Sequence, residues 1–348
     1  MAEAILTENT RRSRFWLYAP FTLLLLVAIA WSVAWFVIRN RAEVALDAWL
    51  AAEAQGGREW TCADRTIAGY PFRIEIVCDT LDLKQGAVSA SFGRTEAVAQ
   101  VYQPRLVIVE ADGPLRVTDG QATVEGRWDL LQASIHGSQT GLRRLSIAAT
   151  GPAFTVAGLM AEPLAASGQR LELHLRPNPS RESERAYDAA LSVKQASLPL
   201  LDRLIGGTEL TDLDADVTVT EATGFQGRPL AEELERWRKA GGALDILMLS
   251  GAKGPRRVEA KGQLKLDEEH RPAGQLSVAA AGLDGLIGKV TGNRAGGALL
   301  GALFGQNPRA KGNDGKPPLS PLPPLTLDNG FLAMGPFVIP NLRLQPLY

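Results

Sequence analysis

The N-terminal segment Phe15–Ile38 contains 24 consecutive residues without a charged side chain, and it constrains the fold more than any other feature. At about 1.5 Å of rise per residue, a helix of this length reaches about 36 Å, more than the roughly 30 Å hydrocarbon core of a bilayer. Aromatic residues lie near both ends, with Phe15 and Trp16 at one and Trp31 and Trp35 at the other. Aromatic rings of this kind favour the headgroup layer, so the segment predicts a transmembrane anchor with an aromatic belt at each end.

The charges on either side of this segment predict its orientation. Three arginines lie within residues 1–14, and two follow the segment, at Arg39 and Arg41. Positive charge is retained on the cytoplasmic side, so we expect residues 1–14 to be a cytoplasmic tail and the bulk of the chain to be exported. The alternative is a cleaved signal peptide, since Ala28-Ile29-Ala30 has the small-x-small pattern of a cleavage site. Either way the remaining domain is exported.

The composition of the remainder is that of an ordinary globular protein. Apolar residues make up 45% and charged residues 22% of the chain, so bulk disorder is not expected. The formal net charge is -1, and Lys and Arg are scattered among Asp and Glu. Binding a phosphate backbone requires a concentrated positive face. We therefore expect no nucleic-acid partner.

The chain beyond the anchor divides into a stalk and one large domain. Residues 39–57 are rich in Ala with Glu and Asp and end at Gly56-Gly57, which predicts a helical stalk that continues the transmembrane helix. Residues 58–348 are expected to form one exported, β-rich domain. Within it, residues 306–324 contain six prolines together with Asn, Gly and Lys, a composition that predicts a flexible insert.

Beyond residue 60 the hydrophobic period changes to two, which predicts strands. The clearest are 213–220 and 258–266, where apolar residues alternate with polar or charged ones. Alternation leaves one face of a sheet in water, as in antiparallel sheets, whereas parallel sheets give continuous apolar runs. Shorter runs of the same kind are 87–92, 97–102, 105–110, 122–125, 142–148 and 171–175, and a closing hairpin is expected around Asn329-Gly330.

Helical patterns are few. They cover 200–205, a polar stretch at 230–240, and 283–304. A strand leading into a short helix occurs twice, beginning at Leu191 and Leu276, although chance similarity in a chain rich in Leu, Ala and Gly is the alternative. The predicted fold class is mainly β (α+β): an extended, curved antiparallel sheet with a few packed helices, preceded by one N-terminal transmembrane helix.

The only two cysteines, Cys62 and Cys78, lie just beyond the predicted stalk. An even number of cysteines at short separation in an exported domain suggests a disulfide. Two buried free thiols are the alternative. A metal site is not expected, because two cysteines supply half of a tetrahedral shell and no histidine lies nearby in the sequence.

Between the cysteines lies the most distinctive local motif, Gly69-Tyr70-Pro71-Phe72-Arg73. The Gly-Tyr-Pro part sets a turn, and Phe72 then opens a strand that ends at Cys78. The motif therefore predicts a signature hairpin, stapled by the disulfide if that bond forms. The functional alternative is a docking edge for a partner.

No catalytic or cofactor-binding arrangement is recognisable. The three histidines lie far apart, without the spacing of metal ligands. The glycine-rich run at 282–297 lacks the spacing of phosphate-binding loops. The three aspartates within 212–216 are not followed by the glycine and glutamate of a calcium loop. We therefore expect no enzymatic activity, no metal and no cofactor.

An N-terminal span, Cys62, the motif at 69–73 and Cys78 together resemble the domain-of-unknown-function 2125 family of Gram-negative envelope proteins. The ending from Leu327-Asp328-Asn329-Gly330 to Ile339-Pro340 is similar to the closing segment of that family. The family has no assigned activity. The resemblance implies an inner-membrane-anchored periplasmic protein with a β-rich body and with its two cysteines paired. The chain is more distantly similar in texture to AsmA-like envelope proteins, whose long antiparallel sheets are implicated in moving or organising lipids.

These observations lead to two functional hypotheses. The first is a non-enzymatic, membrane-anchored periplasmic protein whose curved sheet binds or transfers lipid or another hydrophobic envelope component. The second is a structural or assembly module, in which the hairpin at 69–73 and the polar helix at 230–240 recruit envelope proteins. The expected partners are thus the bilayer itself and either a lipid ligand or an envelope protein. A hydrolase is a third and weaker hypothesis, which would require a polar cleft with converging acid, base and nucleophile.

Overall fold

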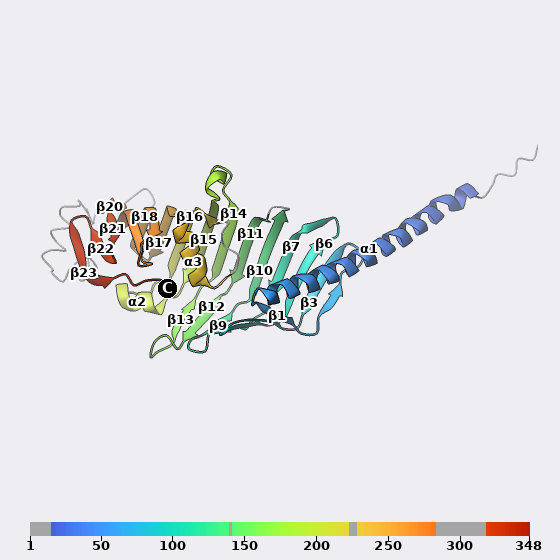
Figure 1. The fold of residues 1–348 in the computed structure, drawn as a ribbon, viewed down its shortest axis with the longest axis horizontal. Coiled ribbons are helices and arrows are strands. Elements are labelled where there is room, and N and C mark those ends of the chain that lie inside the picture. The colour runs from blue at the N-terminus through green and yellow to red at the C-terminus, as the bar shows by residue number, and fades with distance from the viewer. Residues whose placement is uncertain (1–14, 139–140, 223–227, 283–317) are drawn as a thin grey trace, which may run out of the picture.

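The computed structural model describes residues 15–138, 141–222, 228–282 and 318–348. A long N-terminal helix leads into a body of antiparallel strands that lie side by side along the long axis of the molecule (Figure 1). The predicted fold class, mainly β with antiparallel sheets and one long apolar helix at the N-terminus, is confirmed. The helix predicted at 283–304 and most of the insert predicted at 306–324 lie outside the described residues.

Helix α1 runs without interruption from Phe15 to Gln55, and so includes both the predicted anchor and most of the predicted stalk. It is long and apolar enough to cross a membrane. Its N-terminal half projects beyond the end of the body (Figure 1), and large apolar side chains there, such as Leu24 and Phe21, are 71% and 70% exposed. These features are consistent with a single-pass anchor.

The described strands form two antiparallel sheets of sixteen and seven strands, here called the long sheet and the short sheet. The long sheet contains β2 (Thr66–Ala68), β3 (Arg73–Cys78), β6 (Thr95–Gln100), β7 (Gln103–Ala111), β10 (Leu130–Ser138), β11 (Gly141–Thr150), β14 (Arg170–Pro177), β15 (Tyr187–Ala196), β16 (Thr211–Val219), β17 (Leu244–Lys253), β18 (Arg256–Leu266), β19 (Pro272–Ala281), β20 (Ser320–Pro321), β21 (Leu325–Asp328), β22 (Phe331–Met334) and β23 (Phe337–Arg343). The short sheet contains β1 (Glu59–Cys62), β4 (Leu81–Gln85), β5 (Val88–Phe92), β8 (Leu115–Thr118), β9 (Thr123–Arg127), β12 (Ala153–Ala157) and β13 (Leu164–Ser167). The remaining described helices are η1 (Glu182–Glu184), α2 (Pro199–Ile205) and α3 (Leu230–Lys239).

Along the chain, pairs of strands belong alternately to the long sheet and to the short sheet, and this alternation determines how the two sheets are joined. From β2 to β15, each pair of consecutive strands in the long sheet is followed by a pair in the short sheet. Backbone hydrogen bonds continue across the bends between them: the N–H of Gly93 donates to the carbonyl of Asp112 at 3.1 Å, and that of Gly151 to the carbonyl of Gln169 at 2.9 Å. The bends therefore form one common corner, at which the long sheet turns into the short sheet.

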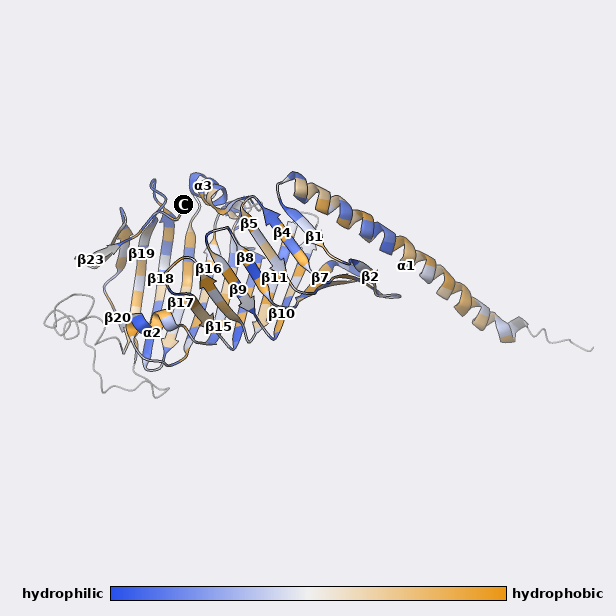
Figure 2. Cartoon of the chain, turned by 90° about the horizontal axis from the view of Figure 1, so that it is seen from below, coloured by the Kyte–Doolittle hydropathy of each residue, from blue (hydrophilic) through white to orange (hydrophobic). Residues whose placement is uncertain are grey.

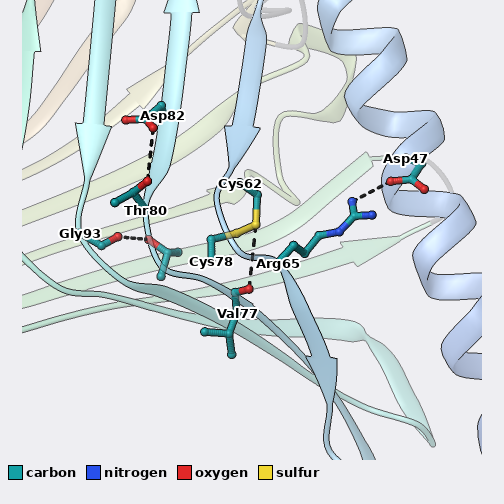
Figure 3. Close-up of a disulfide and its surroundings, with 9 residues drawn as sticks. Asp47, Cys62, Arg65, Val77, Cys78, Thr80, Asp82 and Gly93 are labelled. Carbon is teal, nitrogen blue, oxygen red and sulfur yellow. Dashed lines mark hydrogen bonds and ion pairs between the residues drawn. A yellow bond between two sulfur atoms is a disulfide. The ribbon is translucent and has the colours of Figure 1, made fainter.

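The disulfide joins the two sheets near this corner. Cys62 in β1 and Cys78 in β3 are bonded, with their Cα atoms 5.1 Å apart, and Figure 3 shows the bond beside the ion pair between Arg65 and Asp47 of α1, whose N···O distance is 2.7 Å. Cys78 shares a face of the long sheet with Ile76, because side chains two residues apart lie on the same side of a strand. The predicted disulfide is confirmed, and the alternative of two free thiols is wrong.

Local patterns located several elements but missed others. Strands at 213–220 and 258–266, helices at 200–205 and 230–240, and the closing hairpin correspond to β16, β18, α2, α3 and β21–β22. No local pattern predicted β1, β2, β4, β8, β10, β12, β13 or β17. In β10 the apolar pattern is weak, because the small residues Ala133 and Gly137 occupy two of its alternate positions. In β17 a bulge between Ile246 and Leu249 interrupts the period of two. Ser320–Pro321, within the predicted flexible insert, forms β20 and pairs with β19.

Loss of the disulfide is expected to destabilise the fold. Replacing both cysteines, as Cys62→Ala with Cys78→Ala, should lower the free energy of unfolding by about 3 kcal/mol, because the bond closes a loop of 16 residues. The measurement is chemical denaturation of the full chain in detergent, with reduced wild-type protein as the control. An unchanged denaturation midpoint in both samples would contradict a stabilising role.

A side chain at Gly93 is expected to lower the stability of the corner. A Cβ atom there would lie 2.8 Å from the carbonyl oxygen of Gly113 and 2.9 Å from that of Asp112, so Gly93→Ala should cost about 1–3 kcal/mol through overpacking. Gly137→Ala is the control, because its Cβ would meet only the carbonyl of Arg105, at 3.9 Å. Thermal unfolding followed by circular dichroism should show a lower midpoint for Gly93→Ala alone. Equal midpoints would mean that the corner is not tightly packed.

Candidate functional site

A continuous row of apolar side chains crosses the long sheet from β2 to β19. Each member lies directly opposite the next on the neighbouring strand. The row, called here the long apolar row, consists of Ile67, Ile76, Ala97, Val109, Ala133, Ile147, Leu173, Leu191, Ala215, Leu249, Ala260 and Val278. With strands about 4.8 Å apart, a row across twelve strands is about 53 Å long.

The short sheet carries a second row of the same kind. It crosses all seven strands and is called the short apolar row: Trp60, Leu83, Ala90, Val117, Val124, Val156 and Leu164. Cys62 shares a face with Trp60, and Cys78 shares a face with Ile76. Because the disulfide joins these two cysteines, the faces that carry the two rows are turned toward each other. The space that the apolar face of the long sheet borders, with the short sheet opposite it over β2 to β15, is called the apolar interior.

The apolar interior is not closed into a dry core. In a sandwich, facing sheets interdigitate into a core about 10 Å thick. Here no member of the short apolar row is buried, and Ala260 is the only buried member of the long one. Leu191 and Leu249 remain 39% and 40% exposed. Among the described residues, the largest side chains that are fully buried are Thr211 and Thr218.

The opposite face of the long sheet is polar. Apolar and polar residues alternate along its strands (Figure 2). The neighbouring row through the middle strands contains Glu110, Gln132, Ala148, Glu172, Ser192, Asp214, Ser250 and Glu259. Several charges on this outer face pair with one another. The Nζ atom of Lys194 lies 2.7 Å from both carboxylate oxygens of Asp214, and this interaction holds the pKa of Asp214 below its ordinary value.

Helix α3 covers part of the apolar face of the long sheet. Trp237 is 9% exposed, and its Nε1–H donates to the carbonyl of Thr220 at 2.7 Å. Leu234 and Trp237 line an apolar pocket of about 250 Å³ together with residues of β16 to β19 and with Leu347. The helix predicted to be a polar recruitment surface thus uses its apolar stripe to contact the sheet, while its charged residues pair with each other, as in Glu235 with Arg238.

Helix α2 lies where the short sheet ends. Its residue Arg203 pairs with Glu162 of the β12–β13 loop, with an N···O distance of 3.0 Å. Lys253 of β17 is 3% exposed, and its Nζ donates to Asp202 of α2 at 2.6 Å and to the carbonyl of Glu209. A buried ammonium group requires such partners. This ion pair therefore fixes α2 against the long sheet, beside β13.

The signature hairpin contacts helix α1. Gly69 has φ = +100°, and a Cβ atom there would lie 2.6 Å from the carbonyl oxygen of Arg73, so the turn requires glycine. The Nε1–H of Trp31 donates to the carbonyl of Pro71 at 3.0 Å, and that of Trp35 donates to the carbonyl of Arg73, also at 3.0 Å.

The aromatic rings of the predicted anchor therefore differ in their surroundings. Trp16 is 83% exposed, at the free end of the helix, whereas Trp35 is 5% exposed and lies edge-on to Tyr70 at a centroid distance of 5.3 Å. Phe15 is the first residue of α1. The contact between Trp35 and the hairpin was not visible in the sequence, because the two are separated by more than thirty residues.

The strand histidine His174 lies outside the apolar interior. His174 is on the outer face of β14, where its Nδ1 lies 3.0 Å from Oγ of Ser146. It lines a polar depression of about 750 Å³ with Arg144, Asp188 and Asp216, among others. In the part of the chain that the structure describes, no group of three or more His, Cys, Asp or Glu side chains is arranged to hold a metal ion.

Comparison with known proteins supports one relationship. No curated protein and no solved structure matches the chain. The family described as "uncharacterized protein conserved in bacteria (DUF2125)" matches residues 35–342, which include both cysteines, the signature hairpin and all but the last residue of the two sheets. The more distant similarity to AsmA-like proteins stays a prediction. The match over most of its length shows that the chain belongs to the DUF2125 family of uncharacterized bacterial proteins.

Proposed function

We propose that this protein is anchored in a membrane by α1 and binds lipid acyl chains, or another hydrophobic component of the cell envelope, in its apolar interior. The observation that carries this proposal is the exposure of large apolar side chains along the long apolar row, including Leu191 and Leu249 at 39% and 40%. Extended apolar surfaces on soluble domains mark interaction sites. A row of about 53 Å exceeds the length of one extended acyl chain.

The energetics favour an apolar ligand. Burial of a methylene group gains about 0.8 kcal/mol, so ten methylenes seated against the long apolar row would gain about 8 kcal/mol before the cost of ordering the chain. The rows contain no charged residue, and a charged headgroup would be costly to bury there without a partner. The ligand's headgroup is therefore placed at the open edge of the interior, in water.

The orientation and compartment belong to the same proposal. We place the N-terminus in the cytoplasm and the body in the periplasm, attached to the inner membrane. The three arginines within residues 1–14 support this orientation. The Cys62–Cys78 disulfide supports an oxidising compartment. The role we propose is binding or transfer without chemistry, in line with a sequence in which no catalytic arrangement is recognisable.

A charge placed in the apolar interior is expected to abolish lipid binding. Leu249→Glu puts a carboxylate in the long apolar row, where an acyl chain would have to bury it at a cost of several kcal/mol. Native mass spectrometry of the full chain from detergent should show co-purified phospholipid on the wild type and an occupancy at least tenfold lower on Leu249→Glu. Leu247→Glu is the matched control: it lies in the same strand, is 55% exposed, and lines the polar depression on the outer face.

Two outcomes would contradict the proposal. A wild-type spectrum free of lipid would do so, as would equal lipid occupancy in Leu249→Glu and Leu247→Glu. A stoichiometric protein partner that co-purifies in place of lipid would favour the structural or assembly module. That partner should then be lost on substitution of the hairpin at 69–73 or of α3, and not on substitution of Leu249.

A further inference from the structure

Three exposed aromatic side chains form a cluster next to the membrane helix. Tyr70 and Phe72 of the signature hairpin are 56% and 60% exposed, and Tyr102, in the turn between β6 and β7, is 70% exposed. The N–H of Val101 donates to the carbonyl of Phe72 at 2.9 Å, which brings the two turns together. These three residues are called here the aromatic rim.

The aromatic rim is fixed to a defined level of α1. The rings of Phe72 and Trp31 lie 5.9 Å apart, centroid to centroid. Tyr70 contacts α1 twice, through its ring against Trp35 and through its hydroxyl, which lies 2.8 Å from Oγ of Ser32. Tyr70 and Phe72 therefore lie beside residues 31–35 of the helix, and the Val101–Phe72 hydrogen bond keeps the turn that carries Tyr102 next to them.

This level of α1 coincides with the edge of a bilayer. A hydrocarbon core of roughly 30 Å takes about 20 residues of helix. Counted from Trp16, the second residue of the apolar segment, that length ends near Trp35. The first charged residue beyond is Arg39, whose Nε–H donates to the carbonyl of Ile67 in β2 at 3.4 Å. The rim thus lies on the membrane side of the first charge of the stalk.

The chemistry of the aromatic rim suits a headgroup layer. Neither Gly69–Phe72 nor the turn at Val101–Tyr102 contains a charged residue. Tyr and Phe rings are favoured at the boundary between hydrocarbon and water, where Tyr keeps its hydroxyl in the polar layer. Arg73, the next residue of the hairpin, is 60% exposed at its side chain and pairs with Glu75.

We propose that the aromatic rim docks into the headgroup layer of the same membrane that α1 crosses, and that the N-terminal end of the apolar interior opens there. Ile67 and Ile76, the first members of the long apolar row, lie in β2 and β3, the two strands on either side of the hairpin turn. Lipid then enters at the membrane end and moves along the row away from the bilayer. The docking is inferred from the exposure of the aromatic rim and its contacts with α1 alone, whereas the entry of lipid rests on the proposed function.

Photo-crosslinking from defined positions tests the docking. The full chain, with benzoylphenylalanine in place of Phe72 or of Tyr102, is reconstituted in vesicles of phosphatidylethanolamine and phosphatidylglycerol and irradiated. Leu159, which is 66% exposed in the β12–β13 loop of the short sheet, is the control position, and Leu249 reports on the apolar interior. Phospholipid adducts, identified by mass, are expected at Phe72 and Tyr102 with at least tenfold the yield at Leu159.

The outcomes separate the two proposals. Adducts at Phe72 and Tyr102 that do not exceed those at Leu159 would overturn the docking, even if Leu249 reacts with lipid. Adducts to a second protein at these two positions would also overturn it, in favour of a protein-docking edge. Lipid adducts at Phe72 and Tyr102 with none at Leu249 would support the docking and remove the role in lipid entry.

Discussion

The register of the antiparallel pairs is the constraint on which the structure depends. Side chains alternate between the two faces of a strand, so a slip of one residue would move a whole set of apolar side chains to the outer face. Direct pairing keeps Leu173, Leu191 and Ala215 on one face across three strands. Backbone hydrogen bonds through the corner, and the Cys62–Cys78 bond beside it, connect the pairing of the long sheet to that of the short sheet.

This arrangement stabilises the sheets without filling the space between them. Several of the buried apolar residues are small, such as Ala149, Ala196 and Ala280, and larger apolar side chains of both rows stay partly exposed. The helices reduce that exposure locally, since α3 covers the apolar face with Trp237 and the Lys253–Asp202 pair holds α2 beside β13. An apolar ligand would lower the free energy of the uncovered part, because it replaces water on that surface.

The contact between α1 and the signature hairpin links the body to the helix that is long and apolar enough to cross a membrane. The indole N–H groups of Trp31 and Trp35 donate hydrogen bonds to carbonyls of the hairpin. These bonds fix the first strands of the long sheet, β2 and β3, to α1. The ion pair between Asp47 and Arg65 adds a further contact along α1. In Figure 1 the strands succeed one another from this end toward β23 at the far end. The long apolar row therefore runs from α1 outward.

The sequence by itself determined the features that depend on neighbouring residues. The length of the uncharged segment Phe15–Ile38 predicts a helix that can cross a bilayer, Asn329-Gly330 predicts a tight turn, and alternation within 258–266 predicts a strand with one apolar face. Only the tertiary structure decided which strands pair, in what register, and how far the apolar row continues, since pairing joins residues that are distant in the chain. It also placed Trp35, an aromatic ring of the anchor, against Tyr70, because packing depends on the whole fold and leaves no local pattern.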